Sequence, residues 1–176
     1  MIPDKLQTAN LSLRPFALSD GPAVYEYWKS DPGWEKFNAS VPTGFTASDA
    51  DAWVVEMICR DRQYQPSWAI LHERGVVGVV SLSFENGRRS ASLGYGIHAD
   101  LRGRGLCGEA IDKVLECAFS EDLDLQVYAH TDPGNSASIR VLKKMGFSEE
   151  SAADDAGATF CLSRASWELR RQRVTR

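Results

Sequence analysis

The sequence has no long apolar run and few cysteines. Nowhere do its 176 residues approach the run of about 20 apolar residues that a membrane-spanning helix needs, and its first residues lack the apolar stretch of a secretory signal. The cysteines form neither a CxxC pair nor a cysteine–histidine group with zinc-site spacing; they are Cys59, Cys107, Cys117 and Cys161. We therefore expect a cytoplasmic protein with reduced thiols, no metal and no membrane contact.

The chain also has no excess of positive charge. Its 20 lysines and arginines are outnumbered by 24 aspartates and glutamates, so the formal net charge of −4 gives no general reason to expect nucleic-acid binding. The balance is uneven, because residues 164–176 hold five arginines and one glutamate. This basic end either contacts RNA, a ribosome or an acidic partner, or is the solvated end of a helix. The acidic remainder suits a positively charged partner.

The composition fits one folded domain. A chain of 176 residues, 43% of them hydrophobic, can build a core without metal or disulfide support, and no repeat or long linker divides residues 1–176. Strand-forming segments are expected at residues 11–16, 68–71, 76–84, 91–97, 125–129 and 159–163. Hairpin turns at residues 73–75 and 85–88 predict that the second, third and fourth of these form an antiparallel meander.

Apolar periodicity and capping residues predict helices between these strands. The expected helices start at Ser19 or Asp20, at Ser48 or Asp49, at Leu106 and at Asn135, and the last stops at Gly146. Residues 31–47, with their prolines, glycines and phenylalanines, are expected to form a loop that lies over a binding site or packs on the core. Together the elements predict a single α+β domain with a mixed sheet.

A glycine-rich segment at residues 102–108 leads into the helix that is expected from Leu106. Its glycines are Gly103, Gly105 and Gly108. Glycines let backbone amides approach a ligand closely, and a helix start offers unpaired N–H groups and a positive dipole. Arg102 and Arg104 can add charge-assisted hydrogen bonds. The loop therefore predicts an anion site, and phosphate is the natural occupant.

One pattern in this loop is the G-x-G-x-x-G of dinucleotide-binding domains. Asp132, at the end of the next expected strand, is near where a ribose-binding acid would be expected. However, residues 98–102 separate the glycines from the preceding strand, and the strands before them look antiparallel. We therefore keep an NAD(P)-dependent oxidoreductase as an alternative function and not as the leading hypothesis.

The second pattern, Arg102-x-x-Gly105-x-Cys107, resembles the R/Q-x-x-G-x-G/A pyrophosphate loop of the GNAT acyltransferase superfamily. Leu93-Gly-Tyr95 is similar to the family's fourth strand, and Glu109-Ala110 to the run after its loop. Two further segments resemble the branch that acetylates ribosomal-protein N-termini: Asn135-Ser-Ala-Ser138 followed by Gly146-Phe147, and Leu11-Ser-Leu-Arg14-Pro15-Phe16 followed by Asp20. The resemblance covers residues 11–163.

This resemblance implies a three-layer fold with a mostly antiparallel mixed sheet of about six or seven strands and about four helices. It also implies acetyl-coenzyme A as co-substrate, an amine-bearing acceptor, direct transfer in a ternary complex and a homodimer. A non-catalytic coenzyme A-binding domain is a further alternative. The residues that the resemblance assigns to the coenzyme are Tyr95, Gly96, Ile97, Arg102, Gly103, Arg104, Gly105, Leu106, Cys107, Gly108, Asn135, Ser138, Arg140 and Lys143.

The same resemblance assigns catalytic roles. Ser138 would stabilise or protonate the departing thiolate, and Asn135 would position the pantetheine arm or the substrate. Both residues are equally typical of a helix start, where they would only cap backbone amides. His130 is a candidate general base, because imidazole is the side chain best suited to proton transfer near neutral pH, and His98 and Glu85 are its rivals.

Three positions depart from the family pattern. Cys107 stands where the family prefers glycine or alanine, and its small thiol still lets the amide face a phosphate. Gly96 stands where the branch often has a bulky aromatic residue, which we expect to widen the acyl or acceptor site. Leu142 replaces a tyrosine acid found in many members, and this directs attention to Ser138.

Overall fold

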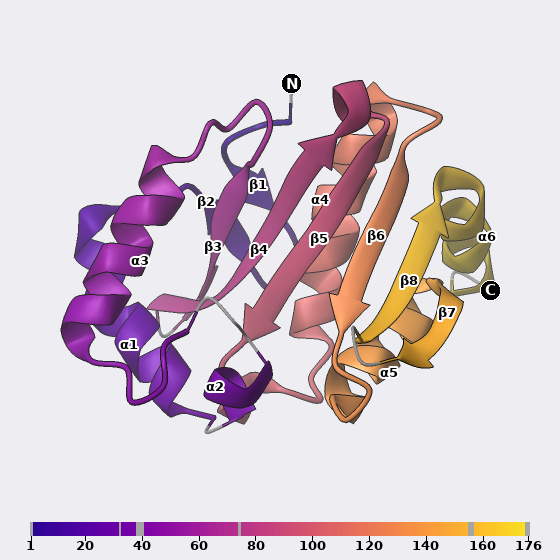
Figure 1. The fold of residues 1–176 in the computed structure, drawn as a ribbon. Coiled ribbons are helices and arrows are strands. Elements are labelled where there is room, and N and C mark those ends of the chain that lie inside the picture. Colours follow the sequence, from indigo (N-terminus) through magenta and orange to yellow (C-terminus); the bar gives the residue numbers. More distant parts are fainter. Residues whose placement is uncertain (1, 32, 38–40, 74, 155–156, 175–176) are drawn as a thin grey trace.

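The computed structural model describes the chain except for residues 1, 32, 38–40, 74, 155–156 and 175–176. Its described residues form a sheet of eight strands in the order β1-β2-β3-β4-β5-β6-β8-β7 (Figure 1). The strands are β1 (Leu6–Gln7), β2 (Ser12–Arg14), β3 (Ser67–His72), β4 (Gly75–Glu85), β5 (Ser90–Ile97), β6 (Gln126–Thr131), β7 (Ser148–Asp154) and β8 (Gly157–Ser163). All neighbouring pairs are antiparallel except β5 and β6. The predicted mixed, mostly antiparallel sheet is confirmed.

The parallel strands β5 and β6 pair only over their first residues. Their register joins Ser90 to Gln126 and ends at Ser92 opposite Tyr128. β5 continues to Ile97 and stays paired with β4 throughout, while β6 continues to Thr131 and stays paired with β8. The two strands therefore separate toward their carboxyl ends (Figure 1). Beyond Ser92, the edge of β5 that faces β6 has no strand partner among the described residues.

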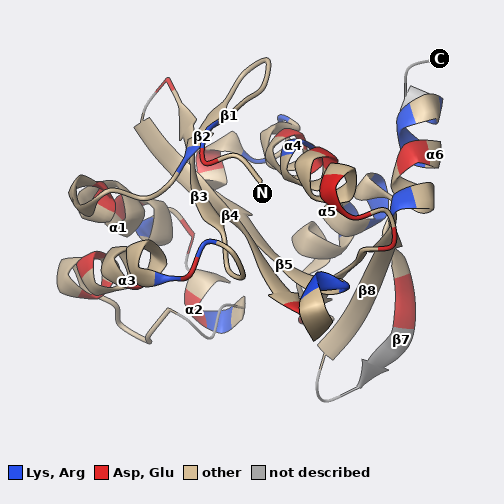
Figure 2. Cartoon of the chain, turned by 90° about the horizontal axis from the view of Figure 1, so that it is seen from above, with Lys and Arg blue, Asp and Glu red and all other residues tan. Residues whose placement is uncertain are grey.

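Six α-helices cover the two faces of the described sheet (Figure 2). On one face lie α1 (Gly21–Lys29), α2 (Gly33–Phe37) and α3 (Ala47–Cys59); on the other lie α4 (Leu106–Glu121), α5 (Ser136–Met145) and α6 (Arg164–Val174). Short 3-10 turns occur at η1 (Leu18–Asp20), η2 (Asn86–Arg88) and η3 (Ala99–Leu101). Each helix layer closes its own apolar core against the sheet, with Trp28 and Val54 in one core and Ile111 and Val114 in the other. The molecule is thus the expected three-layer α/β sandwich.

Helix starts were predicted well where one residue decides them. α4 follows Gly105 and α5 follows Asn135, as the sequence predicts. The cap of α3 was predicted at Ser48 or Asp49, which is wrong. Thr46 is the N-cap, because its hydroxyl accepts the Asp49 amide at 3.3 Å while the Asp49 carboxylate accepts the Thr46 amide at 2.7 Å. This reciprocal pair needs a hydroxyl and an acidic residue three positions apart.

Asp20 is the N-cap residue of α1, which is one of the two positions predicted, but its side chain does not bond to the helix amides. Its carboxylate instead accepts the Ala17 amide at 2.8 Å and both terminal nitrogens of Arg14 at 2.7 Å. The side chain of Asp20 is almost fully buried, so this ion pair joins β2 to the turn before α1. α1 then begins at Gly21 with Pro22 in its first turn.

The sheet has more strands and the chain more helices than predicted. β1 is too short for an alternating pattern to reveal, and β7 lies in the segment 148–157, whose small acidic residues did not predict a strand. The additional helices are α2, inside the expected loop 31–47, and α6, which contains the described residues of the basic end.

The basic end of the chain packs beside α4. Arg164 pairs with Glu168 at 2.7 Å, Arg170 pairs with Asp112, and Arg171 pairs with Glu116 at 3.1 Å. Trp167 packs against Phe119 with ring centroids 5.5 Å apart. Much of the basic charge in this segment is therefore matched by acids of the same chain.

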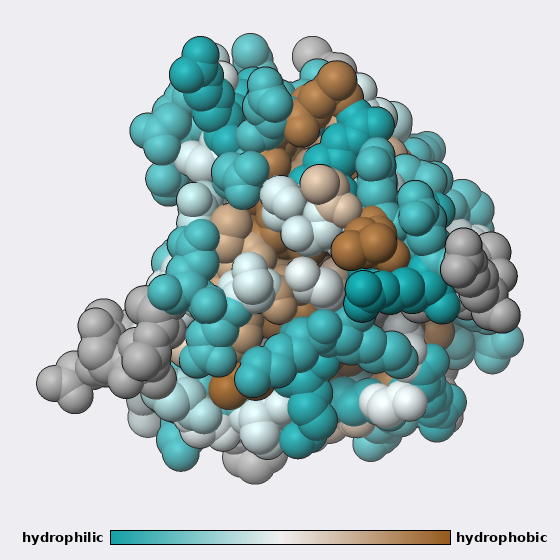
Figure 3. Space-filling model, turned by 90° about the vertical axis from the view of Figure 1, so that its right-hand side faces the viewer, coloured by the Kyte–Doolittle hydropathy of each residue, from teal (hydrophilic) through white to brown (hydrophobic). Residues whose placement is uncertain are grey.

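On this side of the molecule, apolar side chains form a band between hydrophilic ones (Figure 3).

Candidate functional site

The glycine-rich loop leads directly into α4 with open space around its backbone. Gly103 and Gly105 adopt positive φ angles of 76° and 80°, and no heavy atom lies within 4 Å of where a Cβ would stand on either residue. Gly105 is the N-cap of α4 and supplies no side-chain acceptor to the amides of the first turn. These amides stand at the positive end of a 16-residue helix, so the geometry suits an anion, and the anion site stays a prediction.

The two loop arginines differ in their surroundings. Arg102 Nη2 lies 2.5 Å from the Asp31 carboxylate, which precedes α2. The same carboxylate accepts the Gly33 amide at 2.7 Å. Arg104 is exposed, and no hydrogen bond or ion pair to another described residue engages it. The loop is therefore tied to the start of α2 through Arg102, while Arg104 extends into solvent.

Cys107 is a neutral group in this site. Burial raises the pKa of its thiol to about 12, so the thiol stays protonated at physiological pH. A protonated thiol neither repels a phosphate nor serves as a nucleophile. Gly108 faces Met145 of α5, whose sulfur is 3.4 Å from where a Cβ on Gly108 would stand. The missing side chain at Gly108 thus lets α4 and α5 pack closely.

Tyr95 and Ser138 meet between the separated end of β5 and the first turn of α5. The Tyr95 hydroxyl lies 2.8 Å from Ser138 Oγ and 3.3 Å from the Ser138 carbonyl oxygen, to which it donates. Burial raises the pKa of Tyr95, and the hydrogen bond to Ser138 only partly offsets this rise. Both residues were predicted for the site, but their direct contact was not. It joins residues 43 positions apart.

Asn135 acts as the cap that its position suggests. Its side-chain oxygen accepts the Ser138 amide at 3.1 Å. The guanidinium of Arg140 donates to Ser136 Oγ at 3.2 Å, and Lys143 lies 3.7 Å from the Glu149 carboxylate. Arg140 and Lys143 therefore each have a polar neighbour within the chain. Their contact with the phosphates of the coenzyme stays a prediction.

The three candidate bases lie in different places. His130 is exposed at the carboxyl end of β6, where its Nδ1 lies 3.1 Å from Thr159 Oγ1. His98 follows β5 and accepts the Asp100 amide at 3.3 Å. Glu85 pairs with Ser90 and therefore lies at the opposite end of β5 from Gly96. This places Glu85 away from the loop, so it is removed as a candidate base.

Gly96 does not widen the site, contrary to the prediction. A Cβ on Gly96 would lie 2.1 Å from Tyr27 Oη and 2.3 Å from Trp34 Cη2. These two rings pack edge to face with centroids 4.7 Å apart. Aromatic groups from α1 and α2 therefore fill the space that an aromatic residue at position 96 would take.

Tyr27 and Trp34 were missed by the sequence reasoning. The available signal was the combination of a glycine at position 96 with a tryptophan in the apolar loop 31–47, which was expected to lie over a binding site. α2 lies near the end of β5 (Figure 1), and Phe37 Cε1 is 4.0 Å from where a Cβ on Gly134, after β6, would stand. α2 thus reaches from β5 to the segment after β6.

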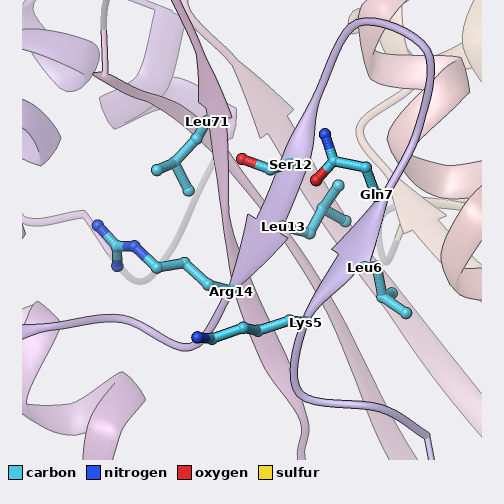
Figure 4. A pocket seen from close by; sticks show the side chains of 7 residues that line it. All are labelled: Lys5, Leu6, Gln7, Ser12, Leu13, Arg14 and Leu71. Carbon is cyan, nitrogen blue, oxygen red and sulfur yellow. The ribbon is translucent and has the colours of Figure 1, made fainter.

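Other sequence candidates and surface features lie outside this arrangement. Leu142 is fully buried in the core, so no acid occupies the family's tyrosine position. A shallow hollow at the β1–β2 edge is lined by side chains that include Lys5, Leu13 and Leu71 (Figure 4), and it contains no predicted site residue. Within the described ranges, no group of three or more metal-ligating side chains occurs, and no helix is long and apolar enough to span a bilayer.

Comparisons with known proteins agree with this geometry. The family model described as Acetyltransferase (GNAT) domain matches residues 10–148. The chain is 28% identical over 159 residues to the uncharacterized N-acetyltransferase p20 of Bacillus licheniformis, covering 86% of each chain. It is 30% identical over 147 residues to the uncharacterized N-acetyltransferase YnaD of Bacillus subtilis (strain 168), covering 82% of this chain and 83% of the relative.

A solved structure of RimJ from Mycobacterium smegmatis, in complex with CoA-disulfide, superposes with a TM-score of 0.76 at 20% identity. The superposition covers 94% of this chain and 90% of that one. At this identity the likeness concerns the fold.

Proposed function

Because the chain belongs to the GNAT acetyltransferase family, we propose that it moves the acetyl group of acetyl-coenzyme A directly to a primary amine, within a ternary complex. The amine is that of a protein N-terminus or of a small molecule. The observation that carries the proposal is the open glycine loop at the start of α4, which stands beside the separated ends of β5 and β6.

The residues present fit the coenzyme. The empty space at the Cβ positions of Gly103 and Gly105 admits pyrophosphate oxygens to the loop amides, including those of Leu106, Cys107 and Gly108. Arg104 adds positive charge there. Arg102 can add more once its ion pair with Asp31 opens. At Tyr95, Gly96 and Ile97, β5 is paired with β4 along one edge only. The other edge, toward β6, has no strand partner among the described residues and offers backbone hydrogen bonds to the pantetheine arm. When bound, acetyl-coenzyme A supplies the activated acetyl group as a thioester.

Ser138 is the proposed proton donor to the leaving thiolate. Either hydroxyl can donate in the hydrogen bond between Tyr95 and Ser138. In the arrangement where Tyr95 donates to Ser138 Oγ, in place of the Ser138 carbonyl, the serine proton is free to be given to the thiolate. Burial keeps the Tyr95 phenol protonated, so it has a proton to donate across the physiological range. Asn135 fixes the first turn of α5 and thereby the position of Ser138. His130 remains the proposed base, with His98 as its rival.

The branch that acetylates ribosomal-protein N-termini is the proposed relationship within the family. The segments around Arg14 and Asn135, together with the likeness to RimJ, support it. A homodimer is proposed by the same resemblance. The oxidoreductase alternative is withdrawn, because the chain belongs to an acetyltransferase family and its sheet has only one parallel pair in the described region, whereas a dinucleotide domain is doubly wound.

Binding and turnover together test the proposal. Thermal shift should show stabilisation by acetyl-coenzyme A and by coenzyme A, and none by NAD or NADP. Release of free thiol should then depend on an amine from a panel of N-terminal peptides and small amines. Stabilisation by NAD(P) alone contradicts the proposal. Coenzyme binding without thiol release from any amine favours the non-catalytic alternative.

A further inference from the structure

The hydroxyl of Tyr27 is buried without a hydrogen-bond partner among the described residues. Tyr27 is only 2% exposed, and Trp34 Nε1 is a second buried donor that lacks a partner in the same described ranges. Folded proteins rarely leave such groups unsatisfied, because burying them without a partner costs free energy. Two unpaired donors on rings that pack together therefore indicate a place for an oxygen that the described residues do not supply.

The Tyr27 hydroxyl and the edge of the Trp34 ring lie over the backbone of β5 at Gly96. Side chains alternate along a strand, so Tyr95 reaches Ser138 on one face while position 96 faces α1 and α2 on the other. Tyr27 Oη is 2.1 Å from where a Cβ on Gly96 would stand, and Trp34 Cζ2, two bonds from Nε1, is 2.6 Å from the same point. The Tyr27 hydroxyl therefore stands beside the stretch of β5 to which the proposed function assigns the thioester arm.

The charges around Tyr27 favour a neutral oxygen as the acceptor for the Tyr27 hydroxyl and the Trp34 indole N–H. The charged groups that act on the Tyr27 hydroxyl are Arg102 and Asp31, and these pair with each other. Cys107 is a protonated thiol, and burial raises the pKa of Tyr27, so its hydroxyl keeps its proton. An indole N–H can only donate, so an amine is a poor ligand for the pair and a carbonyl oxygen is a good one.

We propose that Tyr27 and Trp34 recognise the acyl group: the Tyr27 hydroxyl donates a hydrogen bond to the acyl carbonyl oxygen, and the Trp34 ring restricts the acyl chain to acetyl. The inference rests on the proposed function. The chain-length restriction follows from the Trp34 ring, whose Cη2 and Cζ2 lie 2.3 Å and 2.6 Å from where a Cβ on Gly96 would stand and therefore close the space beside that residue to a longer chain.

Replacing Tyr27 by phenylalanine tests the hydrogen bond without removing the ring. Calorimetry should show that Tyr27→Phe weakens acetyl-coenzyme A binding by about 3- to 10-fold, while the Kd for coenzyme A itself changes by less than about twofold. The melting temperature of the unliganded variant should not fall, because the lost hydroxyl has no partner among the described residues. Tyr25→Phe is the matched control, since Tyr25 lies on the same helix and packs its ring on Phe45. It should leave both Kd values unchanged.

The outcomes separate this inference from the proposed function. Equal weakening of both ligands, an unchanged preference for acetyl-coenzyme A, or a lowered melting temperature would overturn the role of Tyr27. If the wild-type protein binds neither ligand, the proposed function fails and the inference fails with it.

Trp34 is tested by acyl-chain length. The wild-type protein should bind acetyl-coenzyme A at least about tenfold more tightly than butyryl-coenzyme A, because a longer chain would overlap a packed ring. Trp34→Ala should narrow that gap. Trp34→Phe, which keeps an aromatic ring but loses the atoms nearest Gly96, should narrow it partly and serves if the alanine variant does not fold. Equal binding of both thioesters by the wild-type protein would overturn the restriction.

Discussion

The hydroxyls of Tyr95 and Ser138 stand 2.8 Å apart and join β5 to α5 at the place where β5 and β6 have separated. The contact connects two segments that each resemble acetyltransferases but lie far apart in the sequence. It also gives Ser138 a polar partner besides its own helix, which a residue that only caps would not need. The pair is therefore the feature of the site on which mechanism is best tested.

Ser138→Ala should lower kcat by about 100-fold, the scale of a lost proton donor, with little change in coenzyme A affinity. Loss of folding is not expected, because Asn135 caps the backbone amide of residue 138 rather than its side chain. Ser136→Ala, in the same turn, is the control and should retain the wild-type rate. Steady-state thiol release and calorimetry measure the two quantities. An unchanged kcat would remove Ser138 from the mechanism.

Tyr95→Phe should lower kcat by about tenfold, less than the serine variant, because it removes a hydrogen bond to the donor and not the donor itself. The double variant of Tyr95 and Ser138 should be no slower than Ser138→Ala alone, since both changes act on one proton transfer. Additive losses in a double-mutant cycle would show that the two residues act independently.

Asn135→Ala should destabilise the protein by about 1 kcal/mol, the usual cost of losing an N-cap. Asn135→Asp restores a capping oxygen and should recover the stability. Urea unfolding separates this structural role from binding. If the aspartate variant is stable but binds coenzyme A less tightly than wild type, Asn135 also contacts the ligand.

Much of this site could be predicted from the sequence because its elements are local. The loop at Gly105, the start of α4 and the end of α5 at Gly146 depend on residues within one turn of each other. The Tyr95–Ser138 contact and the filling of the space over Gly96 could not be predicted, because they join residues far apart in the chain and depend on how helices settle on the sheet. β7 and α2 were missed because their apolar residues follow neither the two-residue period of a strand nor the 3.6-residue period of a helix clearly.

Asp20 should make stability depend on acid pH. Burial alone would raise the pKa of Asp20, but the hydrogen bonds from Arg14 and from the Ala17 amide outweigh it and lower the pKa. The resulting stabilisation is complete above the unfolded pKa of about 3.9 and is lost as the pH falls through the lower folded value. Asp20→Asn should therefore cost about 2 kcal/mol at pH 7, the scale of hydrogen bonds to a charged group.

The cost of Asp20→Asn should shrink toward zero as denaturant unfolding is repeated at lower pH. Asp4→Asn breaks an exposed pair with Arg62 and is the control; its effect should stay within about 1 kcal/mol. A cost for Asp20→Asn that is the same at pH 7 and at pH 2 would show that the carboxylate charge is not what stabilises the fold.

Gly96→Ala tests the packing of the aromatic pair on β5. A Cβ at this position meets Tyr27 Oη and two ring atoms of Trp34, so we expect a loss of about 1–3 kcal/mol, the usual cost of overpacking. Gly94→Ala is the control, because its Cβ would meet only Ser81 Oγ, which can rotate away. Combining Gly96→Ala with Trp34→Phe should recover some of the lost stability, since the phenylalanine vacates the crowded space. If thermal unfolding finds the Gly96→Ala and Gly94→Ala variants equally stable, the rings do not pack on β5 as tightly as the structure shows, and the basis for acyl-chain restriction is removed.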